Sequence, residues 1–215
     1  MKKNLFILAL LAGLATLPTA QAAITAVTPS GVQIAAPALA LDGAVTNSNQ
    51  QGFDEKQQVF LAAPLDTDAG VGAIPAGTYV SSHMIFFNQE VTKGNPVNSS
   101  SAVWTFDGVI LGVMSDGPGA LEAASTPILG SPTTTYPLGG FSERGLEAGT
   151  ADAYAIPGGL GVGNSLRLNM TVTQPGDWIR VITQSTKPVP EGGQSLILLG
   201  CALTGLGMVR RVVRK

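Results

Sequence analysis

LRLNMTVT, residues 166–173, is the stretch that decides the fold class, because apolar and polar side chains alternate in it without a break. Its apolar members are Leu166, Leu168, Met170 and Val172. Alternation of this length is typical of a β-strand that buries one face and exposes the other. The segment therefore predicts a β-strand with one face buried in a core.

Two turn sequences next to such strands predict hairpins. Residues 174–177 read QPGD, which suits a type II turn, and WIRVIT follows at 178–183. Asp-Gly at 107–108 separates the apolar runs 103–106 and 109–114, and this dipeptide is the strongest short hairpin signal. We therefore expect each pair of runs to form neighbouring antiparallel strands.

The remaining pattern indicates an all-β fold. Further strands are expected at 31–36, 58–62, 78–88 and 153–156. A short helix is expected at 118–125, and loops at 42–52 and 89–101. Seven or eight short strands with turns rich in Gly and Pro predict a β-sandwich or jelly roll over residues 24–187.

The N-terminus has the three parts of a secretory signal peptide. Two lysines precede an apolar run at 5–17, and the small residues Ala20 and Ala22 follow it. Lysines before an apolar helix stay on the cytoplasmic side, and a small-x-small pattern is the substrate of signal peptidase. We expect residues 1–23 to form a signal helix that is cleaved after Ala22 or Ala23.

The C-terminus predicts a marginal membrane anchor. Residues 188–193 read PVPEGG, and 195–209 is an uncharged apolar run. A basic end that includes Arg210 and Arg211 closes the chain. A helix over the apolar run is about 22 Å long, less than the hydrocarbon core of about 30 Å. The positive-inside rule keeps its basic end in the cytoplasm.

Residues 188–215 resemble the PEP-CTERM sorting tail, which has a short proline–acid motif, an apolar helix and an arginine-rich end. The motif is carried here by Val189, Pro190 and Glu191, followed by Gly192 and Gly193. The commonest form of the motif has proline where this chain has Gly192, and variants with Gly-Gly exist. The resemblance implies recognition and removal of the tail by an exosortase, in a Gram-negative bacterium that makes exopolysaccharide. The alternative is an ordinary single-pass tail anchor.

Composition excludes several classes of function for residues 24–187. Six of the 12 Lys and Arg and 13 of the 14 Asp and Glu lie in this segment, so its net charge is −7. An acidic surface argues against nucleic acid as a partner. The single cysteine, Cys201, lies in the tail. This excludes a cysteine nucleophile, a zinc–thiolate site and a disulfide scaffold between the two ends.

Candidate catalytic residues are few. A Ser–His–acid triad would have to use His83, the only histidine, but Ser81 and Ser82 are its strand neighbours. We expect instead a strand histidine with a hydrogen-bond partner. Glu143 and Glu147 are available as a carboxylate pair for glycosidic chemistry. The alternative is a plain loop in which Arg144 pairs locally, and we predict no enzyme.

Two other groups of residues have an alternative interpretation as a binding site, one for a metal ion and one for a sugar. Asp66 and Asp68 resemble the start of a calcium loop that lacks the later ligands. A solvated acidic turn is expected there, with no cofactor, and calcium is the alternative. Trp104 and Trp178 lie among aliphatic residues, so core packing is expected.

These observations predict an exported protein that is anchored transiently in the inner membrane and then reaches the cell surface or medium. We expect a structural or interaction protein with signal peptidase as a processing partner. The resemblance of residues 188–215 to the sorting tail implies an exosortase as a second processing partner and an exopolysaccharide or biofilm matrix as the setting. The leading alternative is a secreted carbohydrate-binding module, which predicts Trp104, Tyr136 or Trp178 at the surface. A glycan-active enzyme is the third, and predicts a cleft with converging carboxylates at 143–147 or near His83.

Overall fold

The computed structural model describes residues 23–42, 47–69, 72–88, 98–147, 151–172 and 176–185. The chain divides into two compact units, Met1–Ser185 and Thr186–Lys215, and every described residue belongs to the first. Residues 1–22 of the predicted signal helix (1–23) and the predicted sorting tail at 188–215 lie outside the described residues. Ala23 is described and is not helical, since its backbone oxygen accepts from the Asp107 amide.

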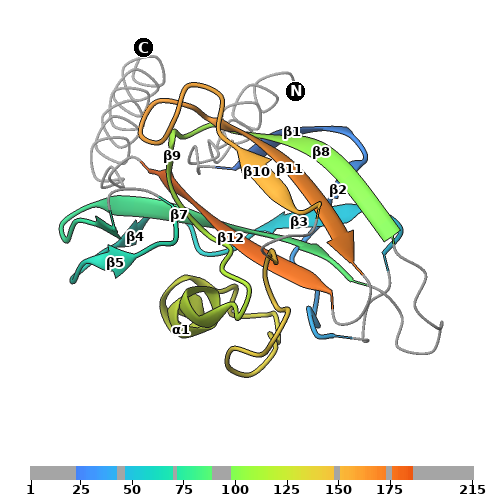
Figure 1. The fold of residues 1–215 in the computed structure, drawn as a ribbon. Helices are drawn as coiled ribbons and strands as arrows, with labels where there is room; N and C mark the ends of the chain where they lie inside the picture. Colours follow the sequence, from blue (N-terminus) through green and yellow to red (C-terminus); the bar gives the residue numbers. More distant parts are fainter. Residues whose placement is uncertain are drawn as a thin grey trace, which may run out of the picture. The chain divides into compact units, whose positions relative to one another are not determined.

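The described part is an all-β fold with one α-helix, as the sequence predicts (Figure 1). The four-stranded sheet has the order β1 (Ile24–Pro29), β8 (Asn98–Phe106), β11 (Ser165–Val172) and β10 (Ala153–Ala155). The six-stranded sheet has the order β2 (Gly31–Gln33), β3 (Gln50–Asp54), β7 (Tyr79–Phe87), β12 (Asp177–Gln184) and β9 (Ile110–Met114), and β4 (Val59–Phe60) also pairs with β7. β5 (Leu65–Asp66) and β6 (Ala73–Ile74) form a separate pair, and α1 is Ala120–Leu129.

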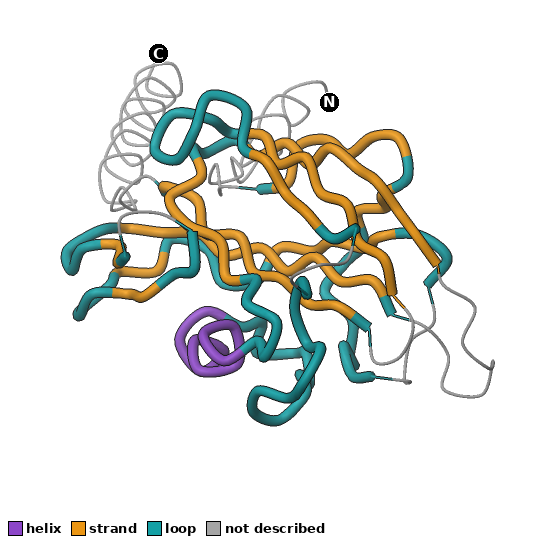
Figure 2. The backbone as a smooth tube through the Cα atoms, in the orientation of Figure 1, coloured by secondary structure: helices purple, strands orange, loops and turns teal. Residues whose placement is uncertain are grey.

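The two large sheets lie one above the other and share a core (Figure 2). Trp104 and Leu166 reach into it from the four-stranded sheet, and Ile85 and Val181 from the six-stranded sheet. α1 lies on the opposite side of the six-stranded sheet (Figure 1). Because β12 lies between β7 and β9 and both of its faces are covered, seven of its eight residues are buried.

Both predicted hairpins are wrong. β11 pairs with β8 and β10, whereas β12 pairs with β7 and β9. Likewise, β8 belongs to the four-stranded sheet and β9 to the six-stranded sheet. The two strands of each predicted hairpin therefore lie in different sheets. Alternation specifies which face of a strand is buried, and it does not specify the neighbouring strand.

One crossing requires a glycine. A Cβ on Gly108 would lie 2.2 Å from the backbone oxygen of Gln184, a distance that no side-chain carbon tolerates. The Asp-Gly sequence therefore serves close backbone approach here, and not the tight turn of a hairpin.

Several predicted boundaries also differ. The strands at 31–36, 58–62, 78–88 and 153–156 are present as the shorter β2, β4, β7 and β10. The helix begins two residues after Pro118 and ends at Leu129, and the predicted loops 42–52 and 89–101 contain the starts of β3 and β8. The serines of 98–101 adopt strand conformation because β8 pairs with β11 there.

A polar link joins the two sheets through the core. Trp104 Nε1 donates to Gln50 Oε1 at 2.9 Å, and Gln50 Nε2 donates to the backbone oxygens of Ser100 and Leu168 at 2.9 and 3.0 Å. Gly52 lies against the indole, since a Cβ there would be 2.5 Å from Trp104 Cζ3. This packing fixes the separation of the sheets at Trp104.

Candidate functional site

The outer face of the six-stranded sheet buries four charged side chains, Glu55, Glu122, Arg144 and Arg180, which we call the buried charge cluster. Arg180, on β12, makes two bonds to Glu55: Nε to Oε2 at 2.7 Å and Nη2 to Oε1 at 2.8 Å. Its Nη2 also lies 3.2 Å from Glu122 Oε1, on α1. All three side chains are 0% exposed.

Arg144 completes the cluster from the loop after α1. Its Nε donates to Glu122 Oε2 at 2.7 Å, and its Nη2 forms an ion pair with the same oxygen. Its Nη1 donates to the backbone oxygens of Pro137 and Gly139. The sequence predicts local pairing of Arg144, and these two backbone contacts are local, but its charge partner lies on the helix.

The cluster joins β12, α1 and the loop that carries Arg144. Acidic and basic side chains alternate along it in the order Glu55, Arg180, Glu122 and Arg144. Burial raises the pKa of Glu122, and the charges of Arg180 and Arg144 oppose that shift. Burial alone lowers the pKa of Arg180, but the carboxylates of Glu55 and Glu122 raise it above its ordinary value. The arginine therefore stays charged, and the cluster holds α1 and the loop against the sheet.

His83 has hydrogen-bond partners on both sides, as expected from the sequence. Its Nδ1 lies 2.7 Å from Asp54 Oδ1, and its Nε2 lies 3.0 Å from Thr183 Oγ1. Ser81 and Ser82 make no hydrogen bond to it among the described residues; Ser82 donates to Glu55 at 2.6 Å.

Asp54, His83 and Thr183 have the connectivity of an acid, a base and a hydroxyl nucleophile. However, His83 and Thr183 are 0% exposed, and the ring centroids of His83 and Phe106 lie 4.8 Å apart. A substrate atom therefore has no access to Thr183 Oγ1 in this structure. The bonds from Asp54 and Thr183 satisfy the hydrogen-bonding groups of the buried His83 ring.

A group of carboxylates meets where β12 begins. Burial, followed by the negative charges of Asp152 and Glu147, raises the pKa of Asp177 to about 9. Asp177 is 1% exposed, and its Oδ2 has no hydrogen-bond partner among the described residues. Asp152 accepts from the backbone amides of Thr171 at 2.6 Å and Glu147 at 3.4 Å.

Glu147 therefore has different neighbours from those considered in the sequence. Burial and hydrogen bonding to Asp152 raise its pKa to about 7, with smaller contributions from the charges of Asp152 and Glu143. Glu143 itself is exposed and has a positive φ of 65°. The structure brings Glu147 to Asp152 and Asp177, two residues that the sequence does not connect with it.

Asp66 and Asp68 have different surroundings in the structure. Asp66 is exposed on β5, and Asp68 Oδ2 accepts from the backbone amides of Ser115 at 2.5 Å and Asp116 at 2.9 Å. Asp68 thus ties this loop to the end of β9. Within the described ranges, no group of three or more His, Cys, Asp or Glu side chains is arranged to hold a metal ion.

The three candidate aromatic residues are buried. Trp104 and Trp178 are 0% exposed, and Tyr136 is 7% exposed. Trp178 Nε1 donates to the backbone oxygen of Ala40 at 2.9 Å, and Tyr136 Oη accepts from the backbone amide of Ser131 at 2.8 Å. The prediction of core packing for the tryptophans is confirmed, and none of the three offers a platform to a sugar ring.

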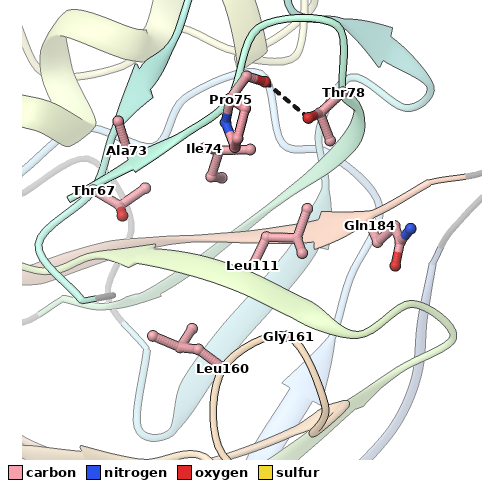
Figure 3. Close-up of a pocket in the computed structure, with 9 residues that line it drawn as sticks. All are labelled: Thr67, Ala73, Ile74, Pro75, Thr78, Leu111, Leu160, Gly161 and Gln184. Carbon is pink, nitrogen blue, oxygen red and sulfur yellow. Dashed lines mark hydrogen bonds between the residues drawn. The ribbon is translucent and has the colours of Figure 1, made fainter. Parts of the chain in front are cut away.

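A surface pocket of about 300 Å³ lies between the β5–β6 pair, β9 and the loop at 157–163 (Figure 3). Its polar side chains include Thr78, which donates to the backbone oxygen of Pro75 at 2.8 Å, and Gln184. Its lining residues are Thr67, Ala73, Ile74, Pro75, Thr78, Leu111, Leu160, Gly161 and Gln184. The lining contains no charged group and no aromatic ring, so the pocket offers mainly aliphatic surface.

Most residues of the predicted sorting signals lie outside the described part of the chain. These are Ala20, Ala22, Val189, Pro190, Glu191, Gly192, Gly193, Arg210 and Arg211. Ala23 is described and lies at the start of the four-stranded sheet. Among the helices of the described segments, none is long and apolar enough to cross a membrane.

Comparisons with protein-family models, with curated proteins and with solved structures found no match to this chain.

Proposed function

We propose that this chain is an exosortase-sorted protein that is exported, loses both ends, and acts at the cell surface or in the medium as a structural or interaction protein. Its proposed setting is an exopolysaccharide or biofilm matrix. The proposal begins from the signal sequence before Ala23 and from the resemblance of residues 188–215 to a sorting tail.

The observation that carries the proposal is the pair of terminal sequence signals, Ala20 and Ala22 after one apolar run and Val189–Glu191 before another. The first strand starts at Ile24 and the last ends at Gln184. The compact unit that contains them ends at Ser185, before the predicted tail. A cut after Ala22 and a cut near Glu191 would both fall outside the described strands.

We assign the two facing sheets to the β-sandwich class, with a jelly-roll-like arrangement. The shared core between a four-stranded and a six-stranded sheet supports this assignment. The one parallel pair among the described strands, β2 with β3, lies at the edge of the six-stranded sheet. A closed core of this kind is stable without disulfides, which the mature segment does not contain.

The positions of the polar groups support an interaction role. The histidine, both tryptophans and the buried charge cluster make their contacts inside the molecule. Exposed apolar side chains lie in loops, including Leu138 at 96% and Val162 at 71% exposure, and also in β4 and α1, where Phe60 and Ile128 are about half exposed. Together with the acidic surface, these residues are the groups available to a partner outside the cell.

The sorting step is tested with a substitution in the motif. Glu191→Ala removes the acidic residue of the motif, and Glu143→Ala removes an exposed glutamate of the folded unit as the matched control. We expect wild type and Glu143→Ala in the surface or medium fraction without residues 195–215. Glu191→Ala should accumulate in the membrane fraction with the tail retained. The same distribution for all three proteins would refute sorting through this motif.

The matrix association is tested separately. We expect the processed protein to sediment with exopolysaccharide purified from the producing cells, and to be released when the polysaccharide is digested. Protein that remains in the supernatant at every polysaccharide concentration would remove the matrix from the proposal and leave the sorting step unaffected.

A further inference from the structure

The start of β1 places two backbone amides against two carboxylates. Ala23 extends the β1–β8 ladder, because the Asp107 amide donates to the Ala23 oxygen at 3.1 Å. In return, the Ala23 amide donates to Asp107 Oδ1 at 2.8 Å. The next amide, that of Ile24, donates to Asp54 Oδ1 at 3.0 Å. Ala23 is thus part of the folded sheet, and its nitrogen already faces an acid.

We propose that signal peptidase cuts between Ala22 and Ala23, and that the α-ammonium group released on Ala23 forms an ion pair with Asp107. This inference rests on the proposed function, since it requires export and removal of the signal peptide. Hydrolysis of the Ala22–Ala23 peptide bond adds the elements of water, giving a carboxylate on Ala22 and an amine on Ala23. The amine takes a proton and keeps its place opposite Asp107 Oδ1.

The small residues Ala20 and Ala22 fit a cut after Ala22, and the folded sheet pairs a chain that begins at Ala23 better than one that begins at Ile24. A chain that begins at Ile24 loses both bonds between Ala23 and Asp107. It would also place the new charge on Ile24, which is 3% exposed, in contact with Asp54. Moving a charge out of water costs free energy unless it is fully paired. Ala23 is only half-buried and Asp107 is exposed, so an ammonium on Ala23 keeps part of its hydration.

The carboxylates around the new terminus also favour a positive charge on the Ala23 nitrogen. Asp107 contacts the Ala23 nitrogen, and Asp54 contacts the adjacent amide and His83. A bond from a charged donor to a carboxylate is stronger than one from a neutral amide. The first residue of the processed chain is therefore bound more strongly than the same residue of the precursor. Removal of the signal peptide thus stabilises the start of β1.

The test uses the full chain, expressed with its own signal peptide in exporting cells. Intact mass identifies the first residue of the exported protein. Labelling of the α-amino group with acetic anhydride at a series of pH values, followed by peptide mass spectrometry, gives its pKa. Asp107→Asn removes the proposed partner, and Asp66→Asn removes an exposed aspartate on β5 as the control.

We expect a chain that begins at Ala23. Its α-amino pKa should lie above the ordinary value of about 7.7–8.0 in wild type and Asp66→Asn, and return to it in Asp107→Asn. A chain that begins at Ile24, or an equal pKa in all three proteins, would overturn the inference while leaving the proposed function intact. A chain that retains residues 1–22 would overturn both.

Discussion

Arg180 and Glu55 form a doubly hydrogen-bonded ion pair in which neither side chain is exposed to solvent. The two bonds measure 2.7 and 2.8 Å, and the residues lie 125 positions apart in the sequence. Glu122 and Arg144 extend the pair into a cluster that connects the six-stranded sheet with α1. The charges depend on one another, because each would otherwise be buried without a partner.

Substitution of Arg180 should therefore be costly. Arg180→Met removes both arginine bonds of Glu55 and leaves Arg144 as the remaining charged partner of Glu122. Removing one partner of a buried pair costs about 3–5 kcal/mol of unfolding free energy. The measurement is urea unfolding of the processed protein.

The matched control is Arg167→Met, which changes an exposed strand arginine on β11. A surface substitution of this kind should change the unfolding free energy by about 0.5 kcal/mol or less. Equal losses for the two variants would show that the buried charge cluster does not stabilise the fold.

Gly52 should not tolerate a side chain. A Cβ at this position would lie 2.5 Å from Cζ3 and 2.7 Å from Cη2 of Trp104, whose ring is fully enclosed. Gly52→Ala should lower the unfolding free energy by about 1–3 kcal/mol through overpacking.

Gly117→Ala is the control for Gly52→Ala, because the nearest atom to its Cβ is the backbone oxygen of Leu146 at 3.7 Å. Near-ultraviolet circular dichroism should show a changed tryptophan environment in Gly52→Ala alone. A variant at Gly52 with wild-type stability and spectrum would mean that the sheets separate more easily than the packing of Trp104 indicates.

The contribution of Asp177 to the unfolding free energy should decrease as the pH rises from about 4 to about 9. Burial and the charges of Asp152 and Glu147 raise the pKa of Asp177 to about 9, whereas an unfolded aspartate titrates near about 3.9. Between these values the folded state binds a proton that the unfolded state has released. The contribution of Asp177 is therefore fully present below the lower value and is lost as the pH approaches the upper one, with a slope of at most about 1.4 kcal/mol per pH unit.

Asp177→Asn keeps the shape of the protonated acid and cannot ionise. It should flatten the dependence of unfolding free energy on pH and stabilise the protein at neutral pH and above, as measured by urea unfolding at a series of pH values. Asp66→Asn, at an exposed position, should retain the wild-type profile. An unchanged slope in Asp177→Asn would assign the pH dependence to other groups.

Strands were easier to predict from the sequence than their partners. Alternation at 166–173 identified β11, and the apolar run at 178–183 identified most of β12. The turn residues between them wrongly predicted a hairpin. Which strands pair depends on how two apolar faces meet across the core, and a local pattern contains only one of those faces.

Among the site residues, too, the sequence predicts the burial of a side chain better than its partner. The burial of Trp104 and Trp178 and the pairing of His83 follow from their apolar strand context, and the structure confirms them. The buried charge cluster was missed, although Arg180 between Ile179 and Val181 is an available signal. A charge flanked by apolar residues within a strand indicates a buried partner, but its identity required the tertiary structure.

Export with processing at both ends is tested most directly by the intact mass of the protein recovered from the producing cells and from their medium. We predict a mass that corresponds to a chain from Ala23 to a residue near Glu191, with or without an added lipid or glycan. A membrane-bound species that still contains residues 195–215 would contradict the sorting of this protein, and its partners would then be sought at the membrane surface.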